Sequence, residues 1–259
     1  MEPSIDSGEL PGASAVVVIP TYNECDNVAL IASGVHKELP QAKILIVDDN
    51  SPDGTGIIAD SLAEQSPDVF AVLHRTEKQG LGAAYVAGYQ HAMRLWPESR
   101  YFIQMDADFS HDPSFLRPLL EAAQDADLAI GSRYVNGISI VNWPLSRLII
   151  SKFASLYART LTGLPTTDCT GGFKCYRAEA LRAIDLPSIR SNGYCFQIET
   201  SFRVWRKGFR LKDVPIVFYE RQRGKSKLNT GIAFEAFIVV LRLGIERLTK
   251  RPAQRAAST

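Results

Sequence analysis

The sequence predicts an α/β fold with a mostly parallel central sheet, followed by C-terminal amphipathic helices. Short apolar runs alternate with helix-length segments through the first half of the chain, which is typical of a parallel sheet covered on both faces. The loops between these segments are rich in Asp, Gly and Pro. A chain of 259 residues with 46% apolar content is long enough to bury a full core.

Five apolar runs predict buried strands, and segments with helical spacing of apolar residues lie between them. The predicted strands cover residues 15–19, 43–47, 69–73, 101–105 and 128–130. The predicted helices cover residues 28–39, 55–65, 81–96 and 113–123. Because the carboxyl ends of parallel strands meet at one crevice, we expect the loops after these strands to converge on a single site.

The loop after the first predicted strand, PTYNE at residues 20–24, contains no glycine. A dinucleotide-binding fold places Gly-x-Gly-x-x-Gly there so that the backbone can approach a pyrophosphate. The loop therefore disfavours an NAD-dependent oxidoreductase. Pro20, the ring of Tyr22 and the carboxylate of Glu24 suit a base and a ribose, and a capped turn into the next helix is compatible with the same residues.

The next two loops combine turn formers with possible ligand contacts. In DDNSPDGT at residues 48–55, a turn explains the serine, proline and glycine better than it explains the acidic pair Asp48 and Asp49. GLGAA at residues 80–84 opens the third helix with small residues, including Gly82. These glycines either border a nucleotide through close backbone approach or serve close helix packing.

The strand predicted over residues 101–105 ends in the triplet Asp106-Ala107-Asp108. Mg2+ and Mn2+ prefer carboxylate oxygens and substrate phosphates, so two carboxylates at the mouth of a sheet suggest a metal site for a diphosphate-bearing substrate. Asp is also common at strand ends, where it caps the following turn. The acidic pair after the strand over residues 43–47 favours the metal site, because both loops lie at the same end of the sheet.

Composition and charge exclude several classes of protein. The 29 Lys and Arg nearly balance the 28 Asp and Glu, so the chain lacks the broad positive field of a nucleic-acid binder. The four cysteines have no paired metal spacing, and the first residues lack the pattern of a signal sequence, so we expect a reduced, cytosolic setting. The longest apolar run near the C-terminus, residues 236–241, is far shorter than the roughly 20 residues of a membrane span.

Taken together, these motifs resemble dolichol-phosphate mannose synthases and their bacterial polyprenol-phosphate counterparts. Those enzymes are inverting glycosyltransferases of family 2 with a GT-A type nucleotide-sugar-binding fold. The resemblance covers roughly residues 15–230, and the order and spacing of its motifs make it specific. Its segments are PTYNE, DDNSPDGT, GLGAA, DADFSH at residues 106–111, GSRY at 131–134, TGGF at 170–173, GYCFQIE at 193–199 and residues 221–228.

The resemblance implies a guanosine site and a metal site. The residues that would hold the guanosine of GDP-mannose are Pro20, Tyr22, Glu24, Val47 and Asp49. Gly82 would border the nucleotide, and Asp106, Ala107 and Asp108 would meet the diphosphate, with both aspartates on Mg2+ or Mn2+. Some relatives add a Gln ligand two residues beyond the second Asp. Ser110 has that position here. Because a hydroxyl is a weaker metal ligand than an amide carbonyl, either Ser110 or a water molecule would complete the coordination of the metal.

The acceptor that the resemblance implies is a polyprenyl or dolichyl phosphate. A phosphate monoester has a second pKa of about 6, so it is mostly dianionic at neutral pH and can attack the sugar carbon without a protein base. Catalysis then depends on positioning and charge. Our candidates for contacts to the anionic groups are Arg133, Arg147, Arg221 and Lys227. Asp168 and Glu199 either orient the mannose hydroxyls or serve capping and packing.

Two amphipathic helices predict contact with a membrane surface. Residues 144–162 carry an apolar stripe with Lys and Arg elsewhere, which suits either an interfacial helix or a helix packed on the core. A helix over residues 232–248 would be about 25 Å long, short of a roughly 30 Å hydrocarbon core. Some relatives recruit a small membrane subunit. We expect a peripheral protein on the cytoplasmic face of the membrane, with a small anchor subunit as a possible partner.

We expect a loose arm over residues 1–14, a catalytic domain over 15–230, and an amphipathic helix and tail over 231–259. The predicted reaction transfers mannose from GDP-mannose to a polyprenyl phosphate with inversion. The nearest alternative is the same reaction with UDP-glucose, although NWP at residues 142–144 and SPDG at 51–54 favour mannose. The other alternative is a nucleotide-binding subunit without activity, which the combination of aspartates and arginines disfavours.

Overall fold

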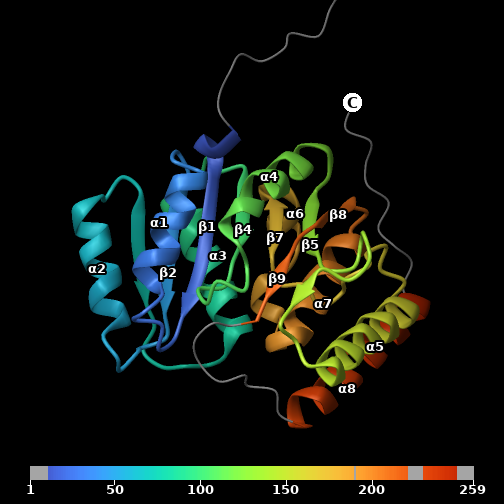
Figure 1. The fold of residues 1–259 in the computed structure, drawn as a ribbon. Helices are drawn as coiled ribbons and strands as arrows, with labels where there is room; N and C mark the ends of the chain where they lie inside the picture. The colour runs from blue at the N-terminus through green and yellow to red at the C-terminus, as the bar shows by residue number, and fades with distance from the viewer. Residues whose placement is uncertain (1–10, 190, 221–229, 250–259) are drawn as a thin grey trace, which may run out of the picture.

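The computed structural model of the chain describes residues 11–189, 191–220 and 230–249, with side chains from residue 236 onward in the last segment. Most of the expected N-terminal arm and C-terminal tail therefore lies outside the described residues. The centre of the fold is a seven-stranded sheet with the order β3-β2-β1-β4-β7-β5-β8, shown in Figure 1. All its strands run parallel except β7. The expected α/β fold with a mostly parallel sheet is confirmed.

The five predicted strands correspond to β1 through β5, with ends that differ by one or two residues. A second, two-stranded sheet pairs β6 with β9. The strand bounds are β1 Ala15–Thr21, β2 Lys43–Asp48, β3 Phe70–His74, β4 Tyr101–Gln104, β5 Leu128–Ser132, β6 Ile140–Val141, β7 Lys174–Arg177, β8 Leu211–Pro215 and β9 Phe218–Tyr219.

The predicted helices are also present, and the one predicted from residue 113 differs most in its start. The segment predicted as a helix from Pro113 begins as a short 3-10 helix, where the Asp112 carboxylate accepts a hydrogen bond from the Ser114 amide at 2.9 Å. The helix bounds are α1 Val28–Glu38, α2 Thr55–Gln65, α3 Leu81–Leu95, α4 Leu116–Asp125, α5 Leu145–Thr162, α6 Ala178–Ala183, α7 Gly193–Arg206 and α8 Thr230–Thr249. The 3-10 helices are η1 Pro11–Ser14, η2 Pro113–Phe115 and η3 Leu186–Ser188.

Two apolar cores lie on the two faces of the sheet, because alternate strand residues point to opposite sides. Val17 of β1 packs in the core with α1, α2 and α4, whereas its neighbour Val16 packs in the core with α3, α6 and α7. A third cluster joins α5 and α8 to α7 through buried residues that include Ala158, Phe202 and Leu243. The sheet is thus covered on both sides, and α5 and α8 form an addition at one end of the molecule (Figure 1).

The reversed strand β7 lies between β4 and β5. Lys174, its first residue, pairs with Gln104 at the end of β4 and with Ile130 of β5. The amino end of β7 therefore lies beside the carboxyl ends of its two parallel neighbours. This arrangement brings the segment before β7, which contains Gly171 and Gly172, next to the loops that follow β4 and β5.

Helices α5 and α8 pack against each other. The rings of Tyr157 and Phe237 stack with their centroids 5.3 Å apart. Arg247 of α8 donates hydrogen bonds to the carbonyl oxygens of Thr160 and Leu161 at the end of α5. None of the described helices has the length and apolar character needed to cross a membrane.

Lys174 is fully buried within the sheet. Its Nζ donates hydrogen bonds to the carbonyl oxygen of Gln197 at 2.6 Å and to Oγ1 of Thr200 at 3.3 Å. Burial lowers the pKa of Lys174 to about 7, because the charged amine is poorly solvated there, while the nearby Cys169 and Asp168 oppose the shift.

We predict that Lys174 makes the stability of the protein increase with pH above about 7. Between this folded-state pKa and the ordinary value of 10.5, the unfolded chain binds the extra proton. Raising the pH therefore favours the folded state, by up to about 1.4 kcal/mol per pH unit. Denaturant titrations from about pH 7 to 9 should show that the stability of the wild type rises relative to that of Lys174→Met. The exposed variant Lys207→Met is the control, and a pH-independent difference for Lys174→Met would contradict the prediction.

Candidate active site

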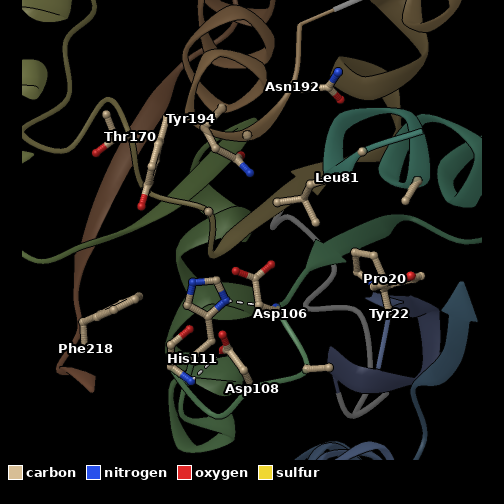
Figure 2. A pocket seen from close by; sticks show the side chains of 18 of the residues that line it. Pro20, Tyr22, Leu81, Asp106, Asp108, His111, Thr170, Asn192, Tyr194 and Phe218 are labelled. Atoms are coloured by element: carbon tan, nitrogen blue, oxygen red, sulfur yellow. Dashed lines mark hydrogen bonds between the residues drawn. The ribbon is translucent and has the colours of Figure 1, made fainter. Parts of the chain in front are cut away.

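A pocket of about 370 Å³ opens at the carboxyl edge of the sheet. Ligand sites commonly have volumes of about 300–1,000 Å³. The loops after the parallel strands line it, together with the segment before β7 and the start of α7 (Figure 2). The predicted site residues that line it are Pro20, Tyr22, Glu24, Asp49, Asp106, Ala107, Asp108, Ser110, Arg133 and Arg147.

Two other predicted residues, Val47 and Gly82, are not part of this lining. Val47 has no exposed surface and packs in the core beneath α3. Gly82 allows close packing, since a Cβ there would lie 2.3 Å from the carbonyl oxygen of Ser191. Of the two explanations for Gly82, the structure supports helix packing. Arg221 and Lys227 lie outside the described residues.

One half of the pocket contains an aromatic ring, a carboxylate and a cation. The Nζ of Lys78 lies 3.7 Å from the centroid of the Tyr22 ring, a favourable contact between a cation and a π system. Asp49 is buried and accepts a hydrogen bond from Arg75. Burial raises the pKa of Asp49 even though the Arg75 charge acts in the opposite direction. This half offers a ring face and hydrogen-bonding groups of both kinds to a ligand.

Asp106 and Asp108 lie at the centre of the pocket wall. Oδ1 of Asp106 accepts a hydrogen bond from the Tyr85 hydroxyl at 2.8 Å, and its backbone amide donates to Nδ1 of His111 at 3.1 Å. Oδ1 of Asp108 accepts from the Ser110 amide at 3.0 Å. Burial and the Asp106 charge raise the pKa of Tyr85 well above its ordinary value. Tyr85 therefore keeps its proton and orients the Asp106 carboxylate.

The two carboxylates are chemically suited to a hard divalent cation. Among the described side chains, no group of three His, Cys, Asp or Glu residues is placed to hold a metal ion. A cation that bridges a diphosphate takes part of its coordination from phosphate oxygens and water. Asp106 and Asp108 fit such an open site, and the buried Ser110 hydroxyl lies in the same lining.

A buried ion pair with Asp168 holds Arg133, which lines the other side of the pocket. Nε and Nη2 of Arg133 donate to the two carboxylate oxygens of Asp168, each at 2.6 Å, and Nη2 also donates to Oγ1 of Thr170 at 2.7 Å. The side chains of Arg133 and Asp168 are only 4% and 0% exposed. Burial alone would raise the pKa of Asp168, but the adjacent guanidinium holds it below its ordinary value. Asp168 therefore fixes the Arg133 guanidinium beside the pocket.

Trp143 is close to both arginines of the pocket. Its ring centroid lies 4.1 Å from Cζ of Arg147 and 5.5 Å from Cζ of Arg133. Nη1 of Arg147 also donates to Oε1 of Glu220 at 2.9 Å. In Figure 2, Thr170, Tyr194 and Phe218 lie across Asp106 from Pro20 and Tyr22. The pocket thus has a ring-and-carboxylate half and an arginine-containing half, with two aspartates between them.

Several pocket residues had no role assigned from the sequence. They are Lys78, His111, Trp143, Thr170, Gly172, Asn192, Tyr194, Gln197 and Phe218. The sequence could have pointed to many of them, because they fall within the motifs that carry the family resemblance. Asp168 and Glu199, which had a possible role in orienting sugar hydroxyls, do not line the pocket. Glu199 instead accepts hydrogen bonds from Arg203 and Ser191.

The sheet with helices on both faces, and the two-part pocket at its carboxyl edge, define a GT-A type fold. Its likeness to a crystal structure of glucosyl-3-phosphoglycerate synthase from Mycobacterium tuberculosis, in complex with Mn2+, UDP and phosphoglyceric acid, shows the same fold. The TM-score is 0.65 at 16% identity, with 90% of this chain and 79% of the other covered. Residues 16–185 match the family described as glycosyl transferase family 2, and the chain belongs to that family.

Two bacterial relatives are similar over nearly the whole chain. The polyprenol monophosphomannose synthase of Mycolicibacterium smegmatis is 48% identical over 236 residues, which cover 91% of this chain and 88% of that protein. The undecaprenyl-phosphate mannosyltransferase of Micrococcus luteus is 48% identical over 230 residues, which cover 89% of this chain and 93% of that protein.

We predict that Asp168→Asn destabilises the protein strongly. Asparagine keeps the shape of the side chain but leaves the buried Arg133 charge without its counter-ion, which costs on the order of 3–5 kcal/mol. Asp125→Asn is the control, because it removes the carboxylate of an exposed ion pair with Lys212, and such pairs contribute at most about 1 kcal/mol. Urea denaturation measures both effects. Equal, small losses in the two variants would contradict the structural role of Asp168.

Proposed function

We propose that this protein transfers mannose from GDP-mannose to a polyprenyl phosphate, including dolichyl phosphate, with inversion at the sugar carbon. The observation that carries the proposal is the order of groups in one pocket. The ring and carboxylate of Tyr22 and Asp49 suit a nucleoside, Asp106 and Asp108 suit a metal-bound diphosphate, and the arginines beyond them suit a second anion. The names of the two relatives at 48% identity support mannose as the sugar and a polyprenyl phosphate as the acceptor.

In this proposal Asp106 and Asp108 hold Mg2+ or Mn2+, with Ser110 or water beside them. The ion supplies positive charge that stabilises the departing diphosphate. Tyr85 and the Ser110 amide donate to the two carboxylates and orient them. The structural neighbour that was solved with Mn2+ and UDP supports an ion of this kind.

The acceptor phosphate is its own nucleophile in this proposal, because it is mostly dianionic at neutral pH. Attack on the face opposite the leaving diphosphate gives a β-linked product. Arg147 and Arg133 contact the anionic groups, and Arg221 and Lys227 remain candidates for the same task. The pocket then contributes positioning and charge rather than a general base.

The exposed face of α5 supports contact with a membrane surface. The buried positions of this helix are Ser155, Ala158 and Thr162. Tyr157 and Leu161 pack against the third cluster, but other apolar residues of the helix point outward, and Phe153 and Leu156 are 68% and 57% exposed. The helix therefore packs on α7 and α8 through one side, and its exposed apolar side is available to enter a lipid headgroup region.

Helix α5 reaches the pocket at one end and packs beside α8. Arg147, in the first turn of α5, lines the pocket, so a lipid phosphate at Arg147 has its tail next to the exposed stripe. Phe237, Leu241 and Ile245 of the adjacent α8 are also exposed. These exposed residues support contact with a membrane, and we propose that the protein acts at its cytoplasmic face, together with a small anchor subunit.

A transfer assay tests the proposal and its alternatives together. Purified protein receives radiolabelled GDP-mannose or UDP-glucose, a polyprenyl phosphate and Mg2+ or Mn2+, and the lipid fraction is extracted and counted. We expect label in the lipid from GDP-mannose, with a β linkage in the product. Transfer from UDP-glucose alone would support the glucosyltransferase, and no transfer from any donor would support a non-catalytic subunit.

We predict that Asp108→Ala lowers the transfer rate by at least about 100-fold, because charge stabilisation of this kind commonly contributes that much or more. The free energy of unfolding should fall by only about 1–3 kcal/mol, because the Ser110 amide loses its acceptor. Asp125→Ala, at an exposed position, is the matched control and should retain full activity. Metal-dependent transfer at the wild-type rate in Asp108→Ala would place the metal elsewhere.

We predict that the outward face of α5 serves only membrane-embedded acceptors. Phe153→Glu with Leu156→Glu should lower transfer to a long-chain acceptor in vesicles but not to a short, water-soluble one. Arg147→Ala should lower transfer to both, because it removes a phosphate contact.

The control for the charge itself is Leu30→Glu with Ile57→Glu, which changes two exposed apolar residues on α1 and α2. That variant should behave as the wild type with both acceptors. Equal losses for both acceptors in the α5 double variant would show that this face serves the fold.

A further inference from the structure

Gln197 of α7 lies between a buried polar network and the pocket. The residue is 3% exposed, and it lines the pocket. Its Oε1 accepts a hydrogen bond from Nε2 of Gln104, on β4, at 2.7 Å. Its own carbonyl oxygen accepts from the buried Lys174. Both ends of Gln197 are thus held by the central sheet.

The orientation of the Gln104 amide follows from its other partners. Nε2 of Gln104 also donates to the carbonyl oxygen of Gly172 at 2.8 Å, and Oε1 accepts from the Tyr89 hydroxyl at 2.9 Å. A carbonyl oxygen can only accept a hydrogen bond. Rotating the Gln104 amide by half a turn would place two acceptor oxygens against each other, so Gly172 fixes which side carries the amino group.

The same reasoning fixes the orientation of Gln197. Gln104 presents an N–H to it, so Gln197 must turn its oxygen toward Gln104, and its amino group faces the other way. Within the described part of the chain, Nε2 of Gln197 donates no hydrogen bond to another residue. A Cβ on Gly172 would lie 3.4 Å from this nitrogen and 3.4 Å from Cε1 of His111. Glycine at that position keeps the space in front of the amino group open.

The amino group of Gln197 therefore offers two uncharged donors to a ligand in the pocket. His111 and Gly172 lie next to it. Figure 2 shows His111 on the other side of Asp106 from Pro20 and Tyr22 of the nucleoside half. Neutral donors suit hydroxyl oxygens, whereas the charged arginines suit phosphate. On the proposed reaction, the group with hydroxyl oxygens beyond the diphosphate is the transferred hexose.

We propose that Gln197 determines sugar specificity by donating a hydrogen bond to one hydroxyl of the transferred hexose, and that Tyr89, Gln104 and Gly172 position it for this. The inference rests on the proposed nucleotide-sugar transfer. A sugar that lacks the matching hydroxyl leaves a buried donor unsatisfied, which lowers kcat/KM by about 10-fold to 100-fold.

The test compares the wild type with Gln197→Met, a side chain of similar length without donors. The substrates are GDP-mannose and its 2-, 3-, 4- and 6-deoxy analogues, each assayed for kcat/KM with the same acceptor. In the wild type, one analogue should be disfavoured by about 10-fold to 100-fold through Gln197. In Gln197→Met that penalty should fall to within about threefold of GDP-mannose, while the penalties of the other analogues stay unchanged. The affinity for GDP, measured by titration calorimetry, should be the same in both proteins.

Tyr89→Phe tests whether the hydrogen bonds from Tyr89 through Gln104 position Gln197, and it does not change the pocket lining. Removing this hydroxyl frees the oxygen of Gln104, so the penalty for the same analogue should decrease by a few-fold, with GDP affinity unchanged. Unaltered ratios among the analogues in Gln197→Met, or in Tyr89→Phe if the first variant does not fold, would overturn the inference. Absence of mannose transfer by the wild type would instead contradict the proposed function.

Discussion

The reversed direction of β7 is the constraint on which the pocket depends. In a fully parallel sheet, only the loops that follow strands would reach the carboxyl edge. Because β7 runs the other way between β4 and β5, the segment that precedes it also reaches this edge. Asp168, Thr170 and Gly172 are thereby placed beside the loop of Asp106 and Asp108, although about 60 residues separate the two segments in the chain.

Two buried polar systems follow from this placement. The pair of Asp168 and Arg133 connects the segment before β7 with the end of β5. The carbonyl of Gly172 begins the chain of hydrogen bonds that runs through Gln104 to Gln197 of α7. A buried polar group is costly unless it is satisfied, so each system holds its members in one arrangement. The side chains of the pocket are therefore preorganised for a ligand. Such preorganisation suits a reaction whose rate depends on the positioning of its substrates.

Much of the framework could be predicted from the sequence, because it depends on local patterns. The apolar runs gave β1 to β5, and α2 has the bounds expected for it. The aspartates and Tyr22 were expected in one pocket from the rule that strand ends converge, whereas Arg147 was expected there only as a contact for the anionic groups of the implied reaction. The direction of β7, the partner of Arg133 and the orientation of Gln197 depend on contacts distant in sequence, and no local pattern contains them. The role of Gly82 could not be predicted for a similar reason. A motif of small residues is compatible both with a bound ligand and with close helix packing, and only the structure shows the packing contact.

The most direct test of this account is a crystal structure of the protein with GDP-mannose and Mn2+, with the ion located by its anomalous scattering. The account predicts that the ion lies between the diphosphate and the carboxylates of Asp106 and Asp108. The guanosine should lie against Tyr22 and Asp49, and the mannose on the side of Arg133. An ion bound away from both aspartates, or a nucleoside bound in the half that contains Arg133, would contradict it.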